Sequence, residues 1–498
     1  MAKGDKKVKP SPKIVEIRTE PNANISAIAA GETFEVVADN NGHAVLNVKS
    51  GAFNLYLVVN KEGYAPFRDW YNIAGAQHVF IPVITLTKLV VVPTYKLRNG
   101  IVKLNRAVAY DDNGNRLFLS CTLFPARWMY ENERERFAQN LKFLADNRVD
   151  AIRYFEEVGG VNNPADSWYD RSVSPSTPNR KEFIDFVLSY GIRLQPVIFG
   201  GINYSDTPEK RLQLVRNVVE TYKDIPGAIT YYQVANESFK NFPMLSEVNS
   251  LADYIKQNTP NLVTPSSPLE WTEIPFMYKG DLIALHHERQ YGEDGWRYVR
   301  QPYSAREISG YDASSNEEGL GPKSSGEQDA NSLRLAMYAA TGWITRSPFY
   351  CYHPGAGVYL GGQGGRSHNR ESNLWEVENV QETLDAINYV RDTIPHNVPN
   401  WNEYNGNKTE HLLPAEHVWV DGYEDGVTRT YMAINGNNFV MLPYGIKKFS
   451  KHVAKALMTI TVRDVVERRI VDDKTLAPGD IYTFQGTPAG YLVTGELL

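Results

Sequence analysis

Apolar and polar residues alternate in short runs between residues 13 and 90, and no helical period interrupts them. An alternation of period two is typical of strands that bury one face. The dipeptides Asn41-Gly42 and Glu62-Gly63 stand between runs and predict turns. We therefore expect a small β-sandwich over residues 13–92, preceded by a disordered basic tail over residues 1–12.

A different pattern follows between residues 95 and 400, where short apolar runs alternate with amphipathic stretches. One stretch begins with Thr207 as an N-cap and Pro208 at the first helical position, and its apolar residues recur at helical spacing. A hairpin that turns at Asn113-Gly114 leads into the segment. The predicted strands, in chain order, are LFLSCTLF, DAIRYF, IRLQPVIFG, AITYYQVANE, LVTPSS, DLIALHHE, YSAREISG and SPFYCYHP.

Eight strands separated by helices in about 300 residues predict an α/β fold of the (β/α)8 type, a TIM barrel, over residues 93–402. An open, doubly wound parallel sheet is the structural alternative. It is disfavoured because no glycine-rich turn follows a predicted strand, and the run GGQGGR at 361–366 lies in a long loop after the last one. Strand-like alternation then returns and predicts a second small β-sandwich over residues 403–498.

Composition and charge indicate which classes of binding partner to expect. The 498 residues carry a formal net charge of −6, so we expect no general nucleic-acid binding. No stretch approaches the roughly 20 apolar residues of a membrane span, and the basic tail lacks the apolar region of a secretory signal. Two cysteines, Cys121 and Cys351, fall in the first and last predicted barrel strands, and we expect two buried free thiols.

Polar residues, all but one of them ionisable, stand where the predicted barrel strands end, which is where TIM barrels carry their catalytic groups. They are Arg153, Glu156 and Glu157 at the second strand, Asn236 and Glu237 at the fourth, His286, His287 and Glu288 at the sixth, Glu307 at the seventh and His353 at the eighth. Glycoside hydrolysis needs two carboxyl groups at one mouth, one to protonate the leaving oxygen and one, ionised, to attack the anomeric carbon. Their proximity raises the pKa of one of them, and that group later serves as base toward the incoming water.

The segment YYQVANES resembles the fourth strand of the clan A retaining glycosidases, the cellulase- and mannanase-like (β/α)8 enzymes. The resemblance implies that Glu237 is the acid/base and that Asn236 binds the sugar 2-hydroxyl. The segment QPYSAREISGY resembles the clan's seventh strand, which implies that Glu307 is the nucleophile. The likeness covers roughly residues 100–400 and is one of strand order rather than of extended identity.

Two further sets of residues resemble positions of the same clan. Arg153 is similar to the second-strand arginine that lies near the nucleophile and keeps it ionised. His286 or His287, with Tyr291, resembles the clan's sixth-strand His/Tyr pair, although the spacing differs. Only one of the two histidines can face the site, because neighbours on a strand point to opposite faces.

The residues by themselves leave alternatives open. Glu288 or Glu157 is an alternative source of the second carboxylate, and Arg153 is alternatively a structural ion-pair partner inside the barrel. His353 is a candidate for substrate binding or for packing. No His/Asp cluster has the spacing of metal ligands, so we expect neither a metal nor another cofactor.

Aromatic residues make up 12 % of the chain, and flat rings suit the apolar faces of sugars as well as large cores. Four tryptophans fall in or beside loops after barrel strands and are candidates for stacking on sugar rings, with core packing as the alternative. They are Trp128, Trp168, Trp271 and Trp296. Asp166 and Asp170, in the same loop as Trp168, are candidates for binding sugar hydroxyls.

We therefore expect a retaining glycoside hydrolase that cleaves β-glycosidic bonds of a polysaccharide or oligosaccharide. Residues 21–64 resemble the carboxypeptidase-regulatory-like sandwiches that are attached to many extracellular and virion enzymes. The alternative hypothesis is a non-hydrolytic glycan-binding or structural protein of a larger assembly, such as a virion, that docks through this N-terminal domain. A barrel lyase or aldolase would need a Schiff-base lysine or a metal cluster, and no predicted strand ends in lysine.

Overall fold

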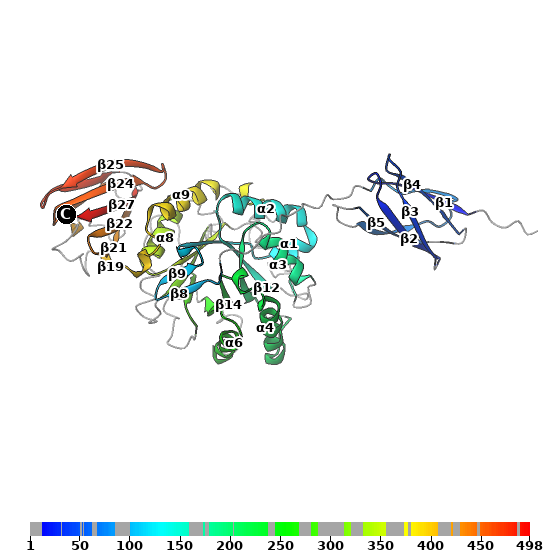
Figure 1. Ribbon diagram of the computed structural model, residues 1–498, viewed down its shortest axis with the longest axis horizontal. Coiled ribbons are helices and arrows are strands. Elements are labelled where there is room, and N and C mark those ends of the chain that lie inside the picture. Colours follow the sequence, from blue (N-terminus) through cyan, green and yellow to red (C-terminus); the bar gives the residue numbers. More distant parts are fainter. Residues whose placement is uncertain are drawn as a thin grey trace, which may run out of the picture. The chain divides into compact units, whose positions relative to one another are not determined.

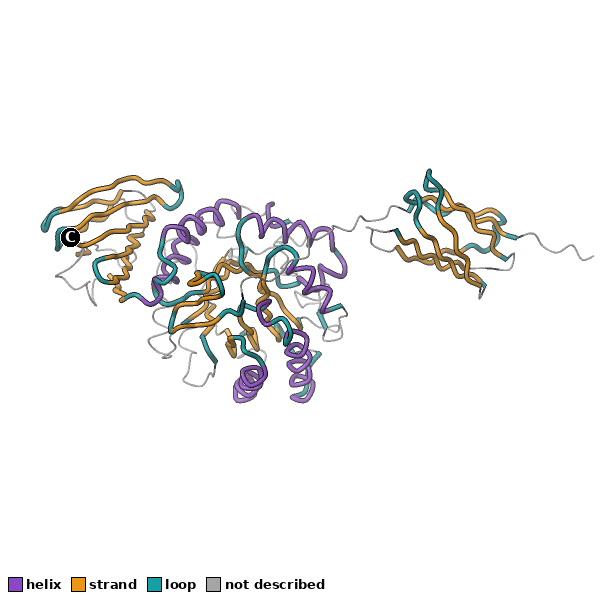
Figure 2. Tube along the Cα trace, viewed as in Figure 1, coloured by secondary structure: helices purple, strands orange, loops and turns teal. Residues whose placement is uncertain are grey.

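The structure is a computed structural model of the whole chain, drawn as a ribbon in Figure 1 and by type of secondary structure in Figure 2. The residues that it describes are 12–30, 32–49, 52, 54–61, 67–84, 100–158, 173–174, 179–202, 204–237, 245–267, 280–286, 313–319, 332–354, 373–376, 380–406, 420–421, 429–445, 449–485 and 489–498. The chain forms two compact units, residues 1–93 and residues 94–498.

The first unit is a pair of small sheets. Its strands are β1 Lys13–Arg18, β2 Asn24–Ala29, β3 Glu32–Val37, β4 His43–Val48, β5 Asn54–Asn60, β6 Phe67–Asn72 and β7 His78–Phe80. One sheet has the order β4-β1-β7 and the other the order β3-β2-β5-β6. Val15 and Ile17 of β1 are fully buried with Leu55 and Leu57 of β5 in one core, as the period-two pattern predicts.

The second unit begins with a short antiparallel sheet in the order β10-β9-β8 and continues as a parallel sheet. The short strands are β8 Lys103–Asn105, β9 Val108–Asp111 and β10 Gly114–Arg116. The parallel strands are β11 Phe118–Thr122, β12 Ala151–Glu157, β13 Arg193–Phe199, β14 Tyr231–Asn236, β15 Leu262–Ser267, β16 Ile283–His286, β17 Ser314–Gly319 and β18 Phe349–His353.

The eight parallel strands form one sheet in the order β15-β14-β13-β12-β11-β18-β17-β16, and the sheet curls like that of a TIM barrel (Figure 1). Its two end strands approach each other. Asp281 N donates to Val263 O at 2.8 Å, and Ala284 N donates to Thr264 Oγ1 at 3.3 Å. The predicted α/β fold with a parallel curled sheet is therefore confirmed.

Helices lie between the strands (Figure 2). They are α1 Ala126–Asn132, α2 Arg134–Asp146, α3 Arg180–Leu188, α4 Pro208–Tyr222, α6 Leu245–Asn258, α8 Ser332–Ile344 and α9 Val380–Thr393, with the 3₁₀ turns η2 Pro226–Ala228, η5 Leu374–Glu376 and η6 Val398–Asn400. The start of α4 is as predicted, because Thr207 Oγ1 accepts a hydrogen bond from Lys210 N at 3.3 Å and Pro208 is the first helical residue.

The seventh barrel strand lies further along the chain than the sequence predicts. The expected strand is residues 303–310, but β17 is Ser314–Gly319, and residues 301–312 lie outside the described part of the chain. The sequence of β17, SSNEEG, has no apolar side chain. Backbone pairing with β16 on one side and β18 on the other forms this strand without an apolar pattern.

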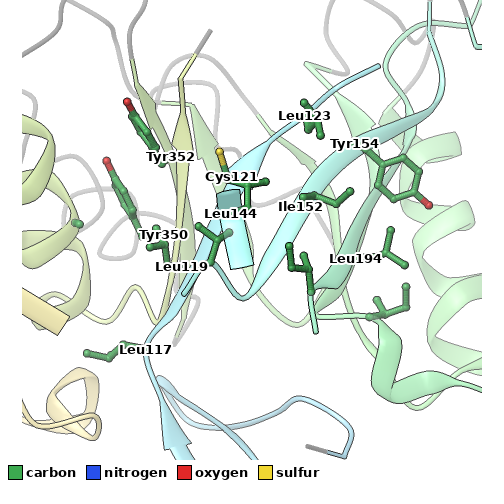
Figure 3. Packing of buried hydrophobic residues seen from close by; sticks show 14 of the residues in the cluster. Leu117, Leu119, Cys121, Leu123, Leu144, Ile152, Tyr154, Leu194, Tyr350 and Tyr352 are labelled. Atoms are coloured by element: carbon green, nitrogen blue, oxygen red, sulfur yellow. The ribbon is translucent and has the colours of Figure 1, made fainter. Parts of the chain in front are cut away.

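The curled sheet has an outer face toward the helices and an inner face. Tyr350 and Tyr352 of β18 belong to the large core on the helix side, and Figure 3 shows them projecting from the same face of the strand. Phe349, which alternates with them, instead packs with Phe118 and Leu282 in a separate cluster. Phe349, Cys351 and His353 are therefore the inner-face positions of β18.

The two cysteines are buried and unoxidised, as predicted. Ser120 pairs with Cys351 across the ladder and Cys121 pairs with Tyr352, so the two thiols occupy opposite faces of neighbouring strands. Side chains on opposite faces point apart, and a disulfide requires Cβ atoms that face each other.

The C-terminal strands are antiparallel where they pair. They are β19 Asn402–Gly406, β20 Val420–Asp421, β21 Arg429–Asn435, β22 Asn438–Gly445, β23 Phe449–Val453, β24 Met458–Asp464, β25 Arg469–Leu476, β26 Ile481–Gln485 and β27 Ala489–Leu497. One sheet has the order β19-β21-β22-β27-β24-β25 and the other β20-β23-β26. Gly490 of β27 packs closely on α8, since a Cβ there would lie 2.2 Å from Leu333 Cδ1.

Candidate active site

The fourth barrel strand, β14, ends at Asn236, and Glu237 follows it directly. Both residues are half-buried. The backbone of Glu237 is left-handed, with φ of 46°. This conformation costs a non-glycine residue roughly 1–2 kcal/mol, and it persists only where contacts with the surrounding structure fix the backbone. Glu237 shares this conformation with seven other non-glycine residues of the described chain, and it is the one that directly follows a barrel strand's carboxyl end in the predicted site.

Arg153, in the middle of β12, holds the end of β14 from inside the barrel. Its side chain is 1 % exposed. Nη2 donates to Asn236 Oδ1 at 2.9 Å and to Gln233 Oε1 at 3.0 Å, and Nε donates to the same Gln233 oxygen at 3.2 Å. Because a guanidinium only donates, these bonds fix which end of the Asn236 amide is its oxygen.

Two phenylalanine rings border the Arg153 guanidinium. Its central carbon lies 5.3 Å from the centroid of the Phe124 ring and 5.8 Å from that of Phe155. The two rings stack on each other with their centroids 4.5 Å apart. Apolar rings exclude water and hold this positive charge in a medium of low dielectric.

Two consecutive glutamates end β12 on opposite faces. Glu156 lies on the helix side, where its Oε2 accepts from Arg127 Nη1 at 2.8 Å and from Arg180 Nε at 3.0 Å. Burial acts to raise the pKa of Glu156, but Arg180 and Arg127 outweigh it and the pKa is lowered. Glu156 is thus a structural ion-pair partner with no access to the barrel mouth.

Glu157 alternates with Glu156 and belongs to the inner face, with Phe155 and Arg153. Its pKa is raised, mainly by burial, although hydrogen bonds from Ser205 and Tyr204 act in the opposite direction. A nucleophile must be ionised to attack, so the raised pKa disfavours Glu157 as the second carboxylate.

His353 ends β18 at the level of Arg153. Thr122 Oγ1 lies 2.5 Å from His353 Nδ1, and Thr122 pairs with Arg153 in the ladder between β11 and β12. The imidazole also lies over Phe124, with the ring centroids 5.2 Å apart. The side chain is 5 % exposed, so packing and the Thr122 hydrogen bond fix the orientation of its ring.

The ladder assigns faces to β17 and β16. Glu317 pairs with Cys351 of β18 and with His286 of β16, whereas Glu318 pairs with Tyr352. Residues paired across a ladder occupy the same face. Positions 317 and 286 therefore belong to the inner face, and position 318 belongs to the helix side.

Of the remaining candidate residues, only Trp128 lies in the part of the chain that the structure describes. Trp128 lies on α1, is partly buried and packs against the cluster that contains Phe124 and Phe155. The others lie outside the described residues: Asp166, Trp168, Asp170, Trp271, His287, Glu288, Tyr291, Trp296 and Glu307.

Within the described ranges, no group of three or more His, Cys, Asp and Glu side chains could hold a metal ion. None of the helices found there is long and apolar enough to cross a membrane.

No family model and no curated protein matches the chain by sequence. Among solved structures, a glycoside hydrolase family 5 protein from Bacteroides vulgatus superposes with a TM-score of 0.55 at 14 % identity, over 81 % of this chain and 95 % of that one. A second glycoside hydrolase gives a TM-score of 0.53 at 12 % identity, over 80 % and 97 % of the two chains. At such identities the likeness shows the fold alone, a TIM-barrel-like α/β domain of the kind that glycoside hydrolases use.

Two polar residues that hold the site are not evident from the sequence. Thr122 binds His353, and Gln233 binds Arg153. Thr122 is the last residue of β11 and Gln233 lies within β14, so both stand in strands that the sequence predicts. Nothing in the sequence distinguishes them from other polar strand residues.

Proposed function

We propose that the protein is a retaining glycoside hydrolase that cleaves β-glycosidic bonds of a polysaccharide or oligosaccharide. Glu237 serves as acid/base, Asn236 binds the hydroxyl next to the anomeric carbon, and a glutamate of β17 serves as nucleophile. The observation that carries the proposal is the Arg153–Asn236 hydrogen bond of 2.9 Å, because it ties a buried cation to the residue that precedes Glu237 at the strand end. The fold is shared with glycoside hydrolases, and TIM barrels carry their chemistry at this end.

The nucleophile that we propose is Glu317. In chain order β17 is the seventh barrel strand, and its inner-face positions are those that pair with Phe349, Cys351 and His353. Of the two glutamates of β17, only Glu317 occupies such a position. Glu307, the nucleophile expected from the sequence, precedes this strand and is the alternative.

The chemistry requires opposite protonation states in the two carboxyls. Glu237 has to carry a proton to the leaving oxygen, while Glu317 has to attack as an anion. Once the sugar is bound covalently to Glu317, that carboxylate has lost its charge, so the pKa of Glu237 falls and it accepts a proton from the water that completes the reaction.

The test is hydrolysis of β-1,4-linked glucan, mannan and xylan, followed by proton NMR of the anomeric product. We expect the wild type to hydrolyse one of them with retention of configuration. Glu237→Gln and Glu317→Gln should each lower kcat by at least about 10³-fold, since each removes a group that takes part in the transition state. Glu318→Gln is the matched control, one residue away on the other face, and should retain wild-type kcat.

Inversion at the anomeric centre would contradict the double displacement. A Glu317→Gln variant with wild-type activity beside an inactive Glu307→Gln variant would return the nucleophile to Glu307. Binding of one of the glycans without any hydrolysis would favour the alternative function, a non-hydrolytic glycan-binding protein on a glycosidase-like fold.

A further inference from the structure

The four-stranded sheet of the first unit, in the order β3-β2-β5-β6, buries one face in the core and turns the other outward (Figure 1). Leu55, Leu57 and Val59 of β5 are fully buried, so the residues that alternate with them point away from the core. Tyr56 and Val58 are therefore outward residues. The ladders with β2 and β6 carry the same assignment to their partners, because residues paired across a ladder share a face.

One row on this outer face is apolar and aromatic. Ile28 of β2 pairs with Tyr56 of β5, and Tyr56 pairs with Trp70 of β6. Ile28 is 47 % exposed and Tyr56 is half-buried. Positions 28 and 70 are two strand spacings apart, about 10 Å. The row is thus longer than a single sugar ring, and aromatic residues offer flat surfaces for stacking on such rings.

Asparagines stand on both sides of this row. Asn54 pairs with Asn72 in the next outward row on one side, and Asn24 pairs with Asn60 two outward rows away on the other. All four are exposed. Asn72 Oδ1 accepts from Ala74 N at 2.9 Å, which leaves its amide nitrogen as a donor. Amides both donate and accept, and so match the hydroxyl groups that surround the apolar face of a sugar.

The charge of the face also indicates a neutral ligand. The charged residues at the outward positions of these four strands are Glu35 and Arg68, which have opposite signs and stand in one row. A nucleic acid or an anionic membrane would need a basic patch. The outer face of the other sheet, β4-β1-β7, is more ionic, since it carries Glu16 between His43 and His78.

The size of the face suits a chain better than a folded partner. Four strands about 4.8 Å apart, with about six residues of about 3.4 Å each, cover about 400 Å². A stable protein interface buries about 800 Å² on each partner. The face alone is therefore too small to hold a second copy of the chain, whereas an oligosaccharide segment fits along one row.

We propose that this outer face binds a neutral polysaccharide, with Tyr56 and Trp70 stacking on its sugar rings and the flanking asparagines bonding to its hydroxyl groups. The surface belongs to the first unit and is independent of the hydrolysis proposed for the second. Its loss should weaken binding to long glycans and leave the hydrolysis of a small glycoside unchanged.

The experiment measures the retardation of the full chain in native gels that contain hydroxyethylcellulose, glucomannan or arabinoxylan, three neutral polysaccharides. All proteins carry Glu237→Gln, which prevents turnover. We expect at least one polysaccharide to retard this parent protein. Tyr56→Ala and Trp70→Ala should each raise the Kd for it by about tenfold, because each removes an aromatic contact. Tyr56→Phe keeps the ring and should bind like the parent.

Two further variants separate binding from folding. Asn54→Ala changes an exposed residue beside the row and should raise the Kd by about threefold. Phe80→Ala is the matched control, because Phe80 pairs with Glu16 on the outer face of the other sheet and is 68 % exposed. It should leave binding unchanged. Equal weakening in Phe80→Ala would overturn the proposal, as would parent-like binding in both Tyr56→Ala and Trp70→Ala.

Retardation by none of the three polysaccharides would also overturn the proposal. So would a dimer in sedimentation that Tyr56→Ala dissociates, since a second copy would then cover the face. In protein with an intact Glu237, kcat/KM for the 4-nitrophenyl glycoside of the hydrolysed sugar should be the same in wild type and Tyr56→Ala. Retardation that depends on Tyr56 and Trp70, in a protein that hydrolyses no glycan, would support this surface while the proposed function fails.

Discussion

The bond between Arg153 and Asn236 gives a quantitative prediction for catalysis. Arg153→Lys keeps a positive charge in the barrel but loses the planar fork that reaches both Gln233 and Asn236. A hydrogen bond from a charged donor is worth about 1.5–3 kcal/mol. If Arg153 acts by holding the Asn236 amide in the transition state, its loss should lower kcat/KM by about 10- to 150-fold.

A double-mutant cycle isolates this coupling. The kcat/KM of wild type, Arg153→Lys, Asn236→Ala and the double variant are measured on the glycan that the wild type hydrolyses, with urea unfolding in parallel to confirm that each variant is folded. The double variant should be no slower than the slower single variant, which corresponds to a coupling of about 1.5–3 kcal/mol. Losses that simply add, to within about 0.5 kcal/mol, would refute the positioning role of Arg153.

Three further predictions concern stability and thiol chemistry. Glu156→Gln should destabilise the protein by about 3–5 kcal/mol, because it leaves two arginines without their buried carboxylate. In a unit of about 400 residues this free energy lowers Tm by about 4–6 °C. A decrease in the calorimetric Tm of less than about 1 °C would contradict this prediction. Glu157 has a raised pKa in the folded state, so its contribution to stability declines as pH rises above its unfolded pKa of about 4.3. The free energy of unfolding of Glu157→Gln, measured in urea, should therefore rise relative to that of the wild type between pH 4 and pH 7. A difference between the two proteins that does not change with pH would count against this. Cys121 and Cys351 should react with a thiol reagent only after unfolding, both as free thiols, and prompt reaction of either in the native protein would contradict their burial.

Most of the barrel is predictable from hydrophobic pattern. In the first barrel strand, β11, every second residue faces the helices, and Leu119 and Cys121 occupy these positions. The pattern fails at β17, whose sequence is entirely polar apart from its glycine. The preceding segment, residues 303–310, contains the apolar residues Tyr303, Ala305 and Ile308. Hydrophobic pattern alone therefore favours that segment over residues 314–319 as the seventh strand. Only pairing with strands far away in sequence identifies β17.

The hydrophobic pattern also predicts part of the candidate site, because it locates the strands that carry three of its residues. Asn236, Glu237 and Arg153 stand at strand positions that the pattern locates well. The second carboxylate depends on which segment is the seventh strand, and one residue of register decides between the inner face and the helix side. The partners of Arg153 and His353 are non-local contacts, Gln233 from β14 and Thr122 from β11, so local sequence carries no signal for them.

The central claim is that the nucleophile is the inner-face glutamate of β17, and covalent trapping tests it most directly. A 2-deoxy-2-fluoro glycoside of the hydrolysed sugar, with a good leaving group, should accumulate as a glycosyl-enzyme ester. Tryptic cleavage after Arg306 and Lys323 gives one peptide that holds Glu307, Glu317 and Glu318, and fragmentation in the mass spectrometer assigns the ester among them. The account predicts the label on Glu317. A label on Glu307 or Glu318, or one outside this peptide, would contradict it.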